Sequence, residues 1–544
     1  MKKLSAAALL MLTAFTVSAQ LTFTEFVCNT AGSSAPVAMK EVNGLVCFFA
    51  TDAAHGKELW VTDGTPGSAH LLVDINPGAA SSAVAGFTEL NGKLYFNAND
   101  GVHGAELWVT DGTVNGTQLV KDIYTGATQS YPYFLTVYNG AVYFNAGDSL
   151  NGYEVWKTDG TGAGTQRLLD INPGTAGSNP NSFVVFNSKL FFRADDGTHG
   201  GELWVTDGTN TNLLKDVNTG SAGSNATPGK ASILNGYLYF SADSGNTGIE
   251  LWRTDGTTAN TQLVKDINSG SGSATPDNFC VYNGQLFFTA DNGSNGNELW
   301  VTNGTANGTT QVKDINTGAA DAYPAYLTVF NGQLFLSAVS ATNGRELWAS
   351  DGTTNGTNLF KDIITGTTAG DPQQFTVFES QLFFSAKDNV TGYQLFKCDG
   401  TASGTQVIAP ANPTAADPLG PGTLFTAGGI CQNALYFSAA YNANGSQLWR
   451  LKNNTVGIND ADYAAANTLQ VYPNPTNNVI QVNFTNGSDA IITITDNSGK
   501  LIYSFNVNQA EATKQISLAA LAPGLYHLNY QSPDFRTSQR VVKY

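Results

Sequence analysis

The sequence has little charge for its length, and the charge it has is mostly negative. Only 13% of its 544 residues are Asp, Glu, Lys or Arg, and the formal net charge is −17. A chain this acidic repels phosphate backbones and anionic lipid. Nucleic acid and membrane surfaces are therefore poor partners. Cations and neutral ligands such as glycans fit this charge better.

Cysteine is also scarce. Its five positions, Cys28, Cys47, Cys280, Cys398 and Cys431, lack the spacing of a metal site. An odd number cannot all pair within one chain. Export would permit disulfides, but the pattern favours the alternative that these are small apolar residues at strand positions.

Long apolar runs are missing after the first one. Lys2 and Lys3 precede an apolar stretch over 4–17, and Val17-Ser18-Ala19 supplies the small residues that a signal peptidase reads before Gln20. Residues 1–19 are therefore expected to be a Sec signal peptide. Later runs fall short of the roughly 20 residues of a membrane span. The mature protein is expected to have no transmembrane segment and to be soluble or surface-attached.

Glycine and aromatic residues are abundant: 58 Gly, 30 Phe and 21 Tyr. This composition is typical of short strands and tight turns. One octet, Glu106-Leu107-Trp108-Val109-Thr110-Asp111-Gly112-Thr113, recurs every 48 residues, with a ninth, degenerate copy after a gap of 53. A period near 40 to 50 indicates propeller blades or helical arrays, and the composition favours blades. The copies begin at Glu58, Glu106, Glu154, Glu202, Glu250, Glu298, Glu346, Gln394 and Gln447.

One unit predicts four strands, at 87–90, 93–98, 107–110 and 118–123. Asn91-Gly92 and Asp111-Gly112 supply the positive φ angles of tight hairpin turns between them. Four antiparallel strands per unit make a propeller blade, so we expect an all-β propeller over residues 20–457. The mature N-terminus, 21–27, lies one period before the fourth strand at 69–75, and the last copy lacks a fourth strand. The N-terminal strand can therefore close a ring of nine blades; eight blades with a terminal cap is the alternative.

Two positions repeat from blade to blade. Lysine recurs on the fourth, edge strand, at Lys121, Lys215, Lys265, Lys313 and Lys361, which blunts an edge against aggregation. A large ring on the third strand can pack one sheet against the next, and we expect this structural role rather than ligand stacking. The tryptophans at this position are Trp60, Trp108, Trp156, Trp204, Trp252, Trp300 and Trp348.

The octet is specific enough to name a resemblance. From about 44 to 450 the chain resembles the bacterial ELWxxDGT-repeat proteins, as in Glu202-Leu203-Trp204-Val205-Thr206-Asp207-Gly208-Thr209. The resemblance implies an exported repeat domain and attaches no common reaction to it.

Residues 469–544 have a different pattern, after an Ala- and Asp-rich linker at 458–468. About seven short alternating strands with turns at sandwich spacing predict a small Ig-like β-sandwich. This tail resembles the type A C-terminal sorting domain of type IX secretion. The resemblance implies recognition by that secretion machinery, passage across the outer membrane, tail removal, and release or attachment to surface lipopolysaccharide. The matching residues are Tyr472, Pro473, Asn474, Pro475, Gly499, Lys500, Pro523, Gly524, Tyr526 and Lys543.

Repeated carboxylates are expected on the face formed by the second-to-third loops and the fourth-to-first connections. Such hard oxygen ligands could hold calcium. The alternative, which we favour, is that each Asp caps its own turn and each Glu orders the loop backbone. We therefore commit to no metal or cofactor. The weak calcium candidates are Asp100, Glu106, Asp122, Asp196, Glu202 and Asp216.

The three loop histidines, His55, His103 and His199, are expected to be turn residues with left-handed backbone. Asparagine takes their position in other copies, as at Asn151, and a metal ligand would not be exchanged so freely.

A catalytic centre on a propeller needs a few unique polar groups. Arg193 is the clearest singular substitution, because Asn or small polar residues take its position elsewhere. One residue is not a site, and neither a serine elbow nor a phosphate loop is evident. We therefore expect no catalytic residues and a non-enzymatic, exported propeller that binds glycan, matrix or a surface protein. The alternatives are a propeller-type polysaccharide hydrolase or lyase, and a structural protein of surface layers or gliding.

Overall fold

The computed structural model describes most of the predicted propeller and part of the tail. Two compact units result, one of which spans Phe23–Leu451 while the other contains the C-terminal sheets. The predicted signal peptide at 1–19 and linker at 458–468 lie outside the described residues. The described residues are 20–390, 392–410, 419, 429–454, 470–472, 479–483, 490–496, 501–507, 513–522, 524–531 and 536–543.

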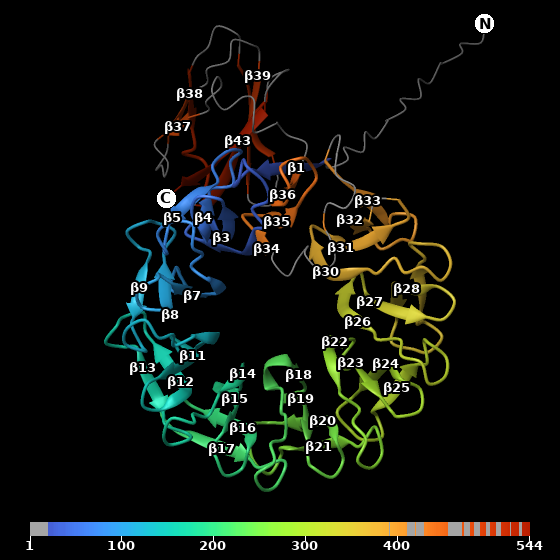
Figure 1. The fold of residues 1–544 in the computed structure, drawn as a ribbon. Helices are drawn as coiled ribbons and strands as arrows, with labels where there is room; N and C mark the ends of the chain where they lie inside the picture. The colour runs from blue at the N-terminus through green and yellow to red at the C-terminus, as the bar shows by residue number, and fades with distance from the viewer. Residues whose placement is uncertain are drawn as a thin grey trace, which may run out of the picture. The chain divides into compact units, whose positions relative to one another are not determined.

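Nine four-stranded sheets in the described part of the chain follow one another around a ring (Figure 1). In the first eight sheets the first strand lies toward the middle of the ring and the fourth lies outside. The first four sheets contain β2 (Val37–Val42), β3 (Leu45–Asp52), β4 (Gly56–Thr62) and β5 (His70–Val73); β6 (Ala85–Leu90), β7 (Lys93–Asn99), β8 (Ala105–Thr110) and β9 (Gln118–Lys121); β10 (Tyr133–Tyr138), β11 (Ala141–Asp148), β12 (Gly152–Thr158) and β13 (Gln166–Leu169); β14 (Asn181–Phe186), β15 (Lys189–Asp195), β16 (Gly201–Thr206) and β17 (Thr211–Lys215).

The fifth sheet follows a short 3₁₀ turn, η1 (Pro228–Lys230). The next four sheets contain β18 (Ser232–Leu234), β19 (Tyr237–Asp243), β20 (Ile249–Thr254) and β21 (Gln262–Lys265); β22 (Asp277–Tyr282), β23 (Gln285–Asp291), β24 (Asn297–Thr302) and β25 (Thr310–Lys313); β26 (Ala325–Phe330), β27 (Gln333–Ser340), β28 (Gly344–Ser350) and β29 (Asn358–Lys361); β30 (Gln373–Phe378), β31 (Gln381–Asp388), β32 (Gly392–Cys398) and β33 (Gln406–Ile408).

The ninth sheet joins the two ends of the propeller. Its strand order is β1 (Gln20–Phe26), β36 (Gln447–Asn454), β35 (Ala434–Ala439) and β34 (Gly429–Cys431). Phe26 and Tyr436 of this sheet pack in one buried cluster with Phe48 and Trp60 of the first sheet. The predictions of nine blades and of a closing N-terminal strand are therefore confirmed.

The middle strands are apolar because both of their faces are buried. On β11, Val142 and Phe144 pack toward the preceding sheet, whereas Tyr143 packs toward the following one. The hairpin before β11 has Asn139 at φ 48° and Gly140 at φ 75°. Two successive positive φ angles are those of the turn that matches strand twist, as the Asn-Gly pair predicts.

Tryptophan and lysine join neighbouring sheets. Trp156 packs in the cluster that unites its own sheet with the preceding one. Lys121 Nζ lies 5.9 Å from the Trp156 ring centroid and donates to Thr165 O at 2.7 Å. Lys215 and Lys265 repeat both contacts on the fourth and fifth sheets. These lysines were predicted as edge protection; in the structure they also clamp the fourth strand to the next blade.

The first strand of most sheets carries a bulge near its start, which the sequence did not predict. The pairing register changes between Tyr133 and Thr136 and again between Ala325 and Thr328. The intervening Phe134 and Tyr326 have φ angles of 60° and 57°. Gly86 takes the same position in another sheet with φ 56°. The scaffold therefore imposes left-handed backbone at this position, whatever residue occupies it.

The tail contains two sheets in its described part. One has the order β37 (Gln470–Tyr472), β38 (Val479–Asn483), β41 (Thr513–Ser517), and the other the order β40 (Leu501–Val507), β39 (Ala490–Asp496), β42 (Gly524–Gln531), β43 (Arg536–Lys543). Ile480, Ile494 and Leu528 form a fully buried core between them. Two packed sheets agree with the predicted sandwich.

All five cysteines are free, and four of them are buried. Burial raises the pKa of the Cys28 and Cys47 thiols to about 12. Among the described residues there is no helix long and apolar enough to cross a membrane.

Candidate functional site

Each octet glutamate is a buried anchor for a backbone connection. Glu106 is fully buried and accepts hydrogen bonds from the backbone N–H groups of Ile123, Tyr124 and Ser130 at 2.9, 3.3 and 3.1 Å. Ser130 Oγ adds a fourth at 2.6 Å. Glu202 holds Val217, Asn218 and Ser224 in the same way. Burial raises the pKa of both carboxyls, and the N–H donors oppose that shift.

The loop aspartates among the calcium candidates bind their own turns. Asp100 accepts from Val102 N and His103 N at 2.9 and 2.7 Å, and its other oxygen lies 2.7 Å from His103 Nδ1. Asp196 repeats the arrangement with His199. The carboxylate raises the pKa of each histidine. The predicted left-handed backbone at these histidines is wrong: positive φ falls on the glycine that follows, 74° at Gly104.

The aspartates that follow the fourth strands cap the next turn. Asp122 Oδ2 accepts from Gly126 N at 3.2 Å, and Asp216 Oδ2 from Gly220 N at 3.5 Å. The six calcium candidates thus lie in two sheets, each set around its own loops. In the part of the chain that the structure describes, no group of three or more His, Cys, Asp or Glu side chains is placed to hold a metal ion.

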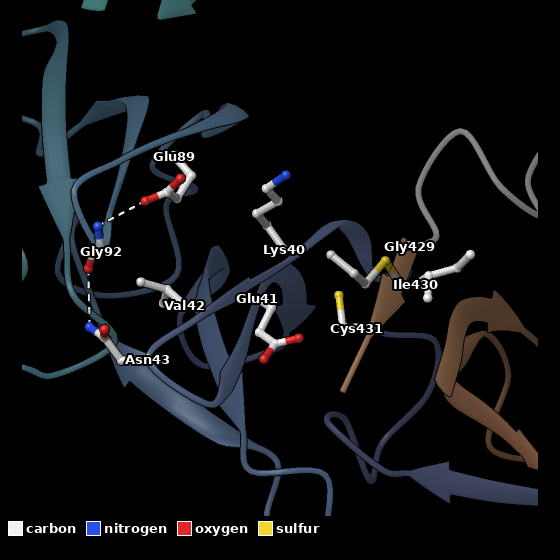
Figure 2. A pocket seen from close by; sticks show the side chains of 10 residues that line it. Lys40, Glu41, Val42, Asn43, Glu89, Gly92, Gly429, Ile430 and Cys431 are labelled. Carbon is white, nitrogen blue, oxygen red and sulfur yellow. Dashed lines mark hydrogen bonds between the residues drawn. The ribbon is translucent and has the colours of Figure 1, made fainter. Parts of the chain in front are cut away.

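A first hollow, the Glu41 hollow, lies at the Asn-Gly turns of the first strands. It encloses about 600 Å³ and is lined by Lys40, Glu41, Asn43, Glu89 and Ile430 among others (Figure 2). Lys40 and Glu41 project to opposite sides of β2. Glu89 accepts from Gly92 N at 2.8 Å, Glu41 from Gln432 N at 2.7 Å, and Asn43 donates to Gly92 O at 3.0 Å. These hydrogen bonds tie neighbouring turns together, so these polar groups have a role in the fold.

A second hollow, the Tyr326 hollow, lies at the opposite ends of the first strands, where the bulges are. It encloses about 430 Å³ between β22, β26 and β30. Tyr323 and Tyr326 present aromatic rings there with 55% and 39% of their surface exposed. The residues that define it are Asp277, Asn278, Tyr323, Tyr326, Arg345 and Asp371.

One charged network supports the rim of the Tyr326 hollow. Asp371 accepts from Gln373 Nε2 at 2.8 Å and from the Tyr393 hydroxyl, and Lys387 Nζ lies 3.8 Å from the same carboxylate. Arg345 Nε lies 3.8 Å from Asp371 Oδ1, and its Nη1 donates to Tyr323 O at 2.9 Å. The guanidinium thereby joins the Tyr323 loop to the next sheet.

Charges and rings also affect one another in this hollow. Burial raises the pKa of Tyr326, and Asp371 raises it further, while Arg345 opposes the shift. Burial lowers the pKa of Arg345, whose side chain is 21% exposed. The phenol therefore stays a neutral hydrogen-bonding group, and the guanidinium stays charged, across the physiological range.

The Tyr326 hollow breaks the symmetry of the ring. Arg345 stands directly before the octet glutamate, where the other regular copies have Lys57, Ala105, Tyr153, Gly201, Ile249, Asn297 and Tyr393. The position of Asp371 is filled elsewhere by Ala35, Ala83, Tyr131, Asn179, Thr227, Thr275 and Tyr323. Comparing these two repeat positions along the sequence would have shown the asymmetry.

Arg193, the singular residue found in the sequence, reaches the same region of its own blade. Its Nε donates to Gly201 O at 3.3 Å, and a side chain at Gly201 would collide with the guanidinium. Gly201 stands at the repeat position of Arg345. The side chain of Arg193 thus lies over a glycine whose missing side chain makes room for it.

The sorting residues that the structure describes lie on the tail sheets. Tyr526 is buried and donates to Ala522 O at 2.8 Å. Lys543 is also buried, and its ammonium donates to the carbonyls of Ala519, at 3.4 Å, and Leu521. Tyr472 ends β37 and Gly524 begins β42. The remaining predicted sorting residues lie outside the described residues: Pro473, Asn474, Pro475, Gly499, Lys500 and Pro523.

Similar solved structures, one of them a β-propeller domain, match the chain at low similarity. The chain matches a prolyl endopeptidase at 14% identity over 66% of this chain and 55% of the other, with a TM-score of 0.36. It matches the β-propeller domain of the Trilobed protease from Pyrococcus furiosus at 12% identity over 59% of this chain and 96% of the other, with a TM-score of 0.32. It matches Sqt1 of Saccharomyces cerevisiae at 12% identity over 79% of this chain and 99% of the other, with a TM-score of 0.36. The chain thus spans about half the length of the prolyl endopeptidase. Matches at this level say nothing of what this protein binds.

A comparison with curated proteins gave no match. Residues 470–544 match the family model of the secretion system C-terminal sorting domain. The tail is therefore a type IX secretion sorting domain, recognised by that machinery, and the protein is secreted or attached to the surface of the outer membrane.

Proposed function

We propose that this exported propeller binds a glycan in the Tyr326 hollow and does not cleave it. The observation that carries the proposal is the concentration of exposed tyrosine rings and unrepeated polar side chains in one hollow. The C–H faces of a sugar ring pack on aromatic faces, and its hydroxyl groups need donors and acceptors close by. Tyr323 and Tyr326 supply the faces, and Asn278, Arg345 and Asp371 surround them.

The engagement of the carboxylates supports binding rather than hydrolysis. A glycosidase uses two carboxyl groups on either side of the scissile bond, one as acid and one as base or nucleophile. In the Tyr326 hollow Asp371 contacts Arg345 and Lys387, and Asp277 lies 2.8 Å from Lys230 Nζ. Both carboxylates are therefore paired with cations, and their oxygens can accept hydrogen bonds from sugar hydroxyls.

The location supports a glycan as the ligand. Sorting by type IX secretion places the protein outside the cell, where polysaccharides are exposed, and a net charge of −17 suits a neutral polymer better than an acidic one. The proposal includes membership of the ELWxxDGT-repeat proteins, which the nine copies of the octet support.

A glycan array with the full-length secreted protein tests the proposal. Tyr326→Ala and Arg345→Ala are expected to weaken binding at least about tenfold, or about 1.4 kcal/mol. Ser182→Ala and Lys57→Ala change the same repeat positions in other sheets and should leave binding unchanged. Binding to no glycan would overturn the proposal, and release of shorter sugars from a bound polymer would overturn its non-enzymatic part.

A further inference from the structure

A second group of exposed aromatic side chains lies four repeats before the Tyr326 hollow. Tyr133 and Phe134 begin β10 with 43% and 53% of their surface exposed. Tyr131 and Tyr133 stack with their ring centroids 5.9 Å apart and an interplanar angle of 11°, and Phe134 meets Tyr133 edge to face at 6.5 Å. We call these three residues the Tyr133 platform. Tyr131 is half-buried, and together the three contacting rings form a broad apolar surface with phenol groups attached.

The Tyr133 platform and the Tyr326 hollow occupy the same repeat positions. Tyr131 corresponds to Tyr323, and Phe134 corresponds to Tyr326, because each pair is separated by four 48-residue repeats. Both positions have left-handed backbone in both sheets: φ is 47° at Tyr131, 44° at Tyr323, 60° at Phe134 and 57° at Tyr326.

Aromatic residues at these left-handed positions indicate a functional role. Other sheets place Ala83, Gly86 or Ser182 at these positions. Bulky side chains are rare in this conformation because of steric strain, and strained residues concentrate at functional sites. The ring's own packing does not require aromatic residues here, since sheets without them form equally well.

Three charged positions around the Tyr326 hollow are uncharged around the Tyr133 platform, whereas the position of Lys387 is taken by Asp195. Tyr153, Asn179 and Ala85 take the repeat positions of Arg345, Asp371 and Asp277. Asn97, which is buried, donates from Nδ2 to Pro132 O at 3.3 Å and so fixes the carbonyl between Tyr131 and Tyr133. Aromatic faces beside amides and phenols suit a neutral sugar ring and offer no counter-charge to an acidic one.

The two sites belong to sheets on opposite sides of the ring, at the same ends of their first strands (Figure 1). We propose that the Tyr133 platform is a second glycan-binding site, which takes a neutral sugar unit of the same polymer that occupies the Tyr326 hollow. This inference rests on the proposed function. One chain that binds both sites gains affinity by effective concentration, so a polymer should bind more tightly than a short oligosaccharide.

The test uses the full-length secreted protein and a panel of neutral soluble polysaccharides, laminarin, xyloglucan and mannan, with their short oligosaccharides. Calorimetry gives stoichiometry and affinity for the wild type, Phe134→Gly, Tyr133→Ala and Tyr326→Gly. Glycine suits the left-handed positions, as Gly86 shows, so Phe134→Gly and Tyr326→Gly should fold. Ser182→Gly is the matched control at the same repeat position.

The wild type is expected to bind two equivalents of a short oligosaccharide, Phe134→Gly and Tyr326→Gly one each, and both variants to bind polymer at least about tenfold more weakly. If Phe134→Gly and Tyr133→Ala bind like the wild type while Tyr326→Gly does not, the second site is wrong and the proposed function stands. If Tyr326→Gly binds like the wild type while Phe134→Gly does not, the Tyr133 platform stands and the Tyr326 hollow fails. Absence of binding to every member of the panel overturns both.

Discussion

Arg345 and Glu346 are neighbours on β28, yet they belong to two different regions of the molecule. Glu346 recurs in seven sheets, is fully buried and accepts backbone N–H groups of Ile363, Ile364 and Gly370. Arg345 occurs in one sheet and borders a hollow. The repeated residues form a frame that each blade needs in order to close its connection. The side chain directly before each glutamate does not hold this connection, so it can differ from blade to blade and determine which ligand binds.

The largest effect should come from breaking the frame. Glu106→Ala leaves the N–H groups of Ile123, Tyr124 and Ser130 buried without an acceptor. A loss of about 4 kcal/mol in the free energy of unfolding is expected, since each buried unsatisfied group costs about 1–3 kcal/mol. Urea unfolding of the purified protein measures it. Glu106→Gln should lose less, because Gln447 accepts from Cys28 N and Ser34 Oγ in the ninth sheet. A loss below about 1 kcal/mol for Glu106→Ala would contradict a framing role.

The frame should also make stability depend on pH in an unusual direction. Burial raises the pKa of Glu58, Glu250, Glu298 and Glu346 from 4.5 to about 7. Between pH 4.5 and pH 7 the folded chain then holds protons that the unfolded chain has released, so stability falls as pH rises through this window. The expected result is a lower thermal midpoint at pH 7.5 than at pH 5.

A variant separates this effect from other titrations. Glu346→Gln removes one of the carboxyls with a raised pKa. The free energy of unfolding should then depend less on pH, by about 1.4 kcal/mol for each unit by which the pKa of Glu346 is raised. A midpoint that rises between pH 5 and pH 7.5 in the wild type would show that the N–H donors outweigh burial and that these carboxyls are ionised.

A substitution at Tyr326 in the Tyr326 hollow should weaken glycan binding and stabilise the fold. Tyr326→Gly relieves left-handed backbone at a non-glycine residue and should stabilise the fold by up to about 1 kcal/mol, less what the lost ring contacts contribute. Glycan binding at the Tyr326 hollow should be lost in the same variant, while the Tyr133 platform still binds its sugar unit. Thermal unfolding and glycan binding on one preparation test this, and a clear loss of stability would mean that the ring is part of the frame.

The smallest effect is expected in the octet turn. Asp111 Oδ1 accepts from Thr113 N at 2.9 Å and Thr113 Oγ1 at 2.7 Å, and Asn303 makes the same two bonds at 3.0 and 2.8 Å in another sheet. Asp111→Asn should therefore change the free energy of unfolding by less than about 0.5 kcal/mol. Asp111→Ala, which removes both bonds, should cost about 1 kcal/mol. Equal losses in the two variants would assign the effect to charge rather than to the turn's hydrogen bonds.

The fold could be predicted because its signals are local and repeated. The Asn-Gly and Asp-Gly turns and the apolar runs between them placed the strands at 87–90, 93–98, 107–110 and 118–123, close to β6–β9. The closing role of 21–27 followed from its phase in the repeat. The first-strand bulges were missed because left-handed φ at Phe134 or Tyr326 is imposed by the blade, and neither residue type signals it.

The Tyr326 hollow was missed for a different reason. Its residues come from three sheets, and Tyr323, Arg345 and Asp371 come together only through the packing of one blade on the next. The sequence showed a singular arginine at Arg193, which reaches its region from the second strand, whereas Arg345 does so from the third. Comparison along a single repeat position cannot reveal side chains that converge from different positions.

The order of strands in the ninth sheet imposes an order on folding. β1 is the first strand of the ring to be synthesised, and its neighbour β36 is among the last, more than 400 residues later. Every other sheet of the ring can form from strands adjacent in sequence, but β1 must wait until β36 has been synthesised before it finds its neighbour. Closing so long a loop is slow, and an unpaired strand is prone to wrong partners meanwhile. The ring's last contact can therefore form only after synthesis has reached β36, near the end of the propeller sequence.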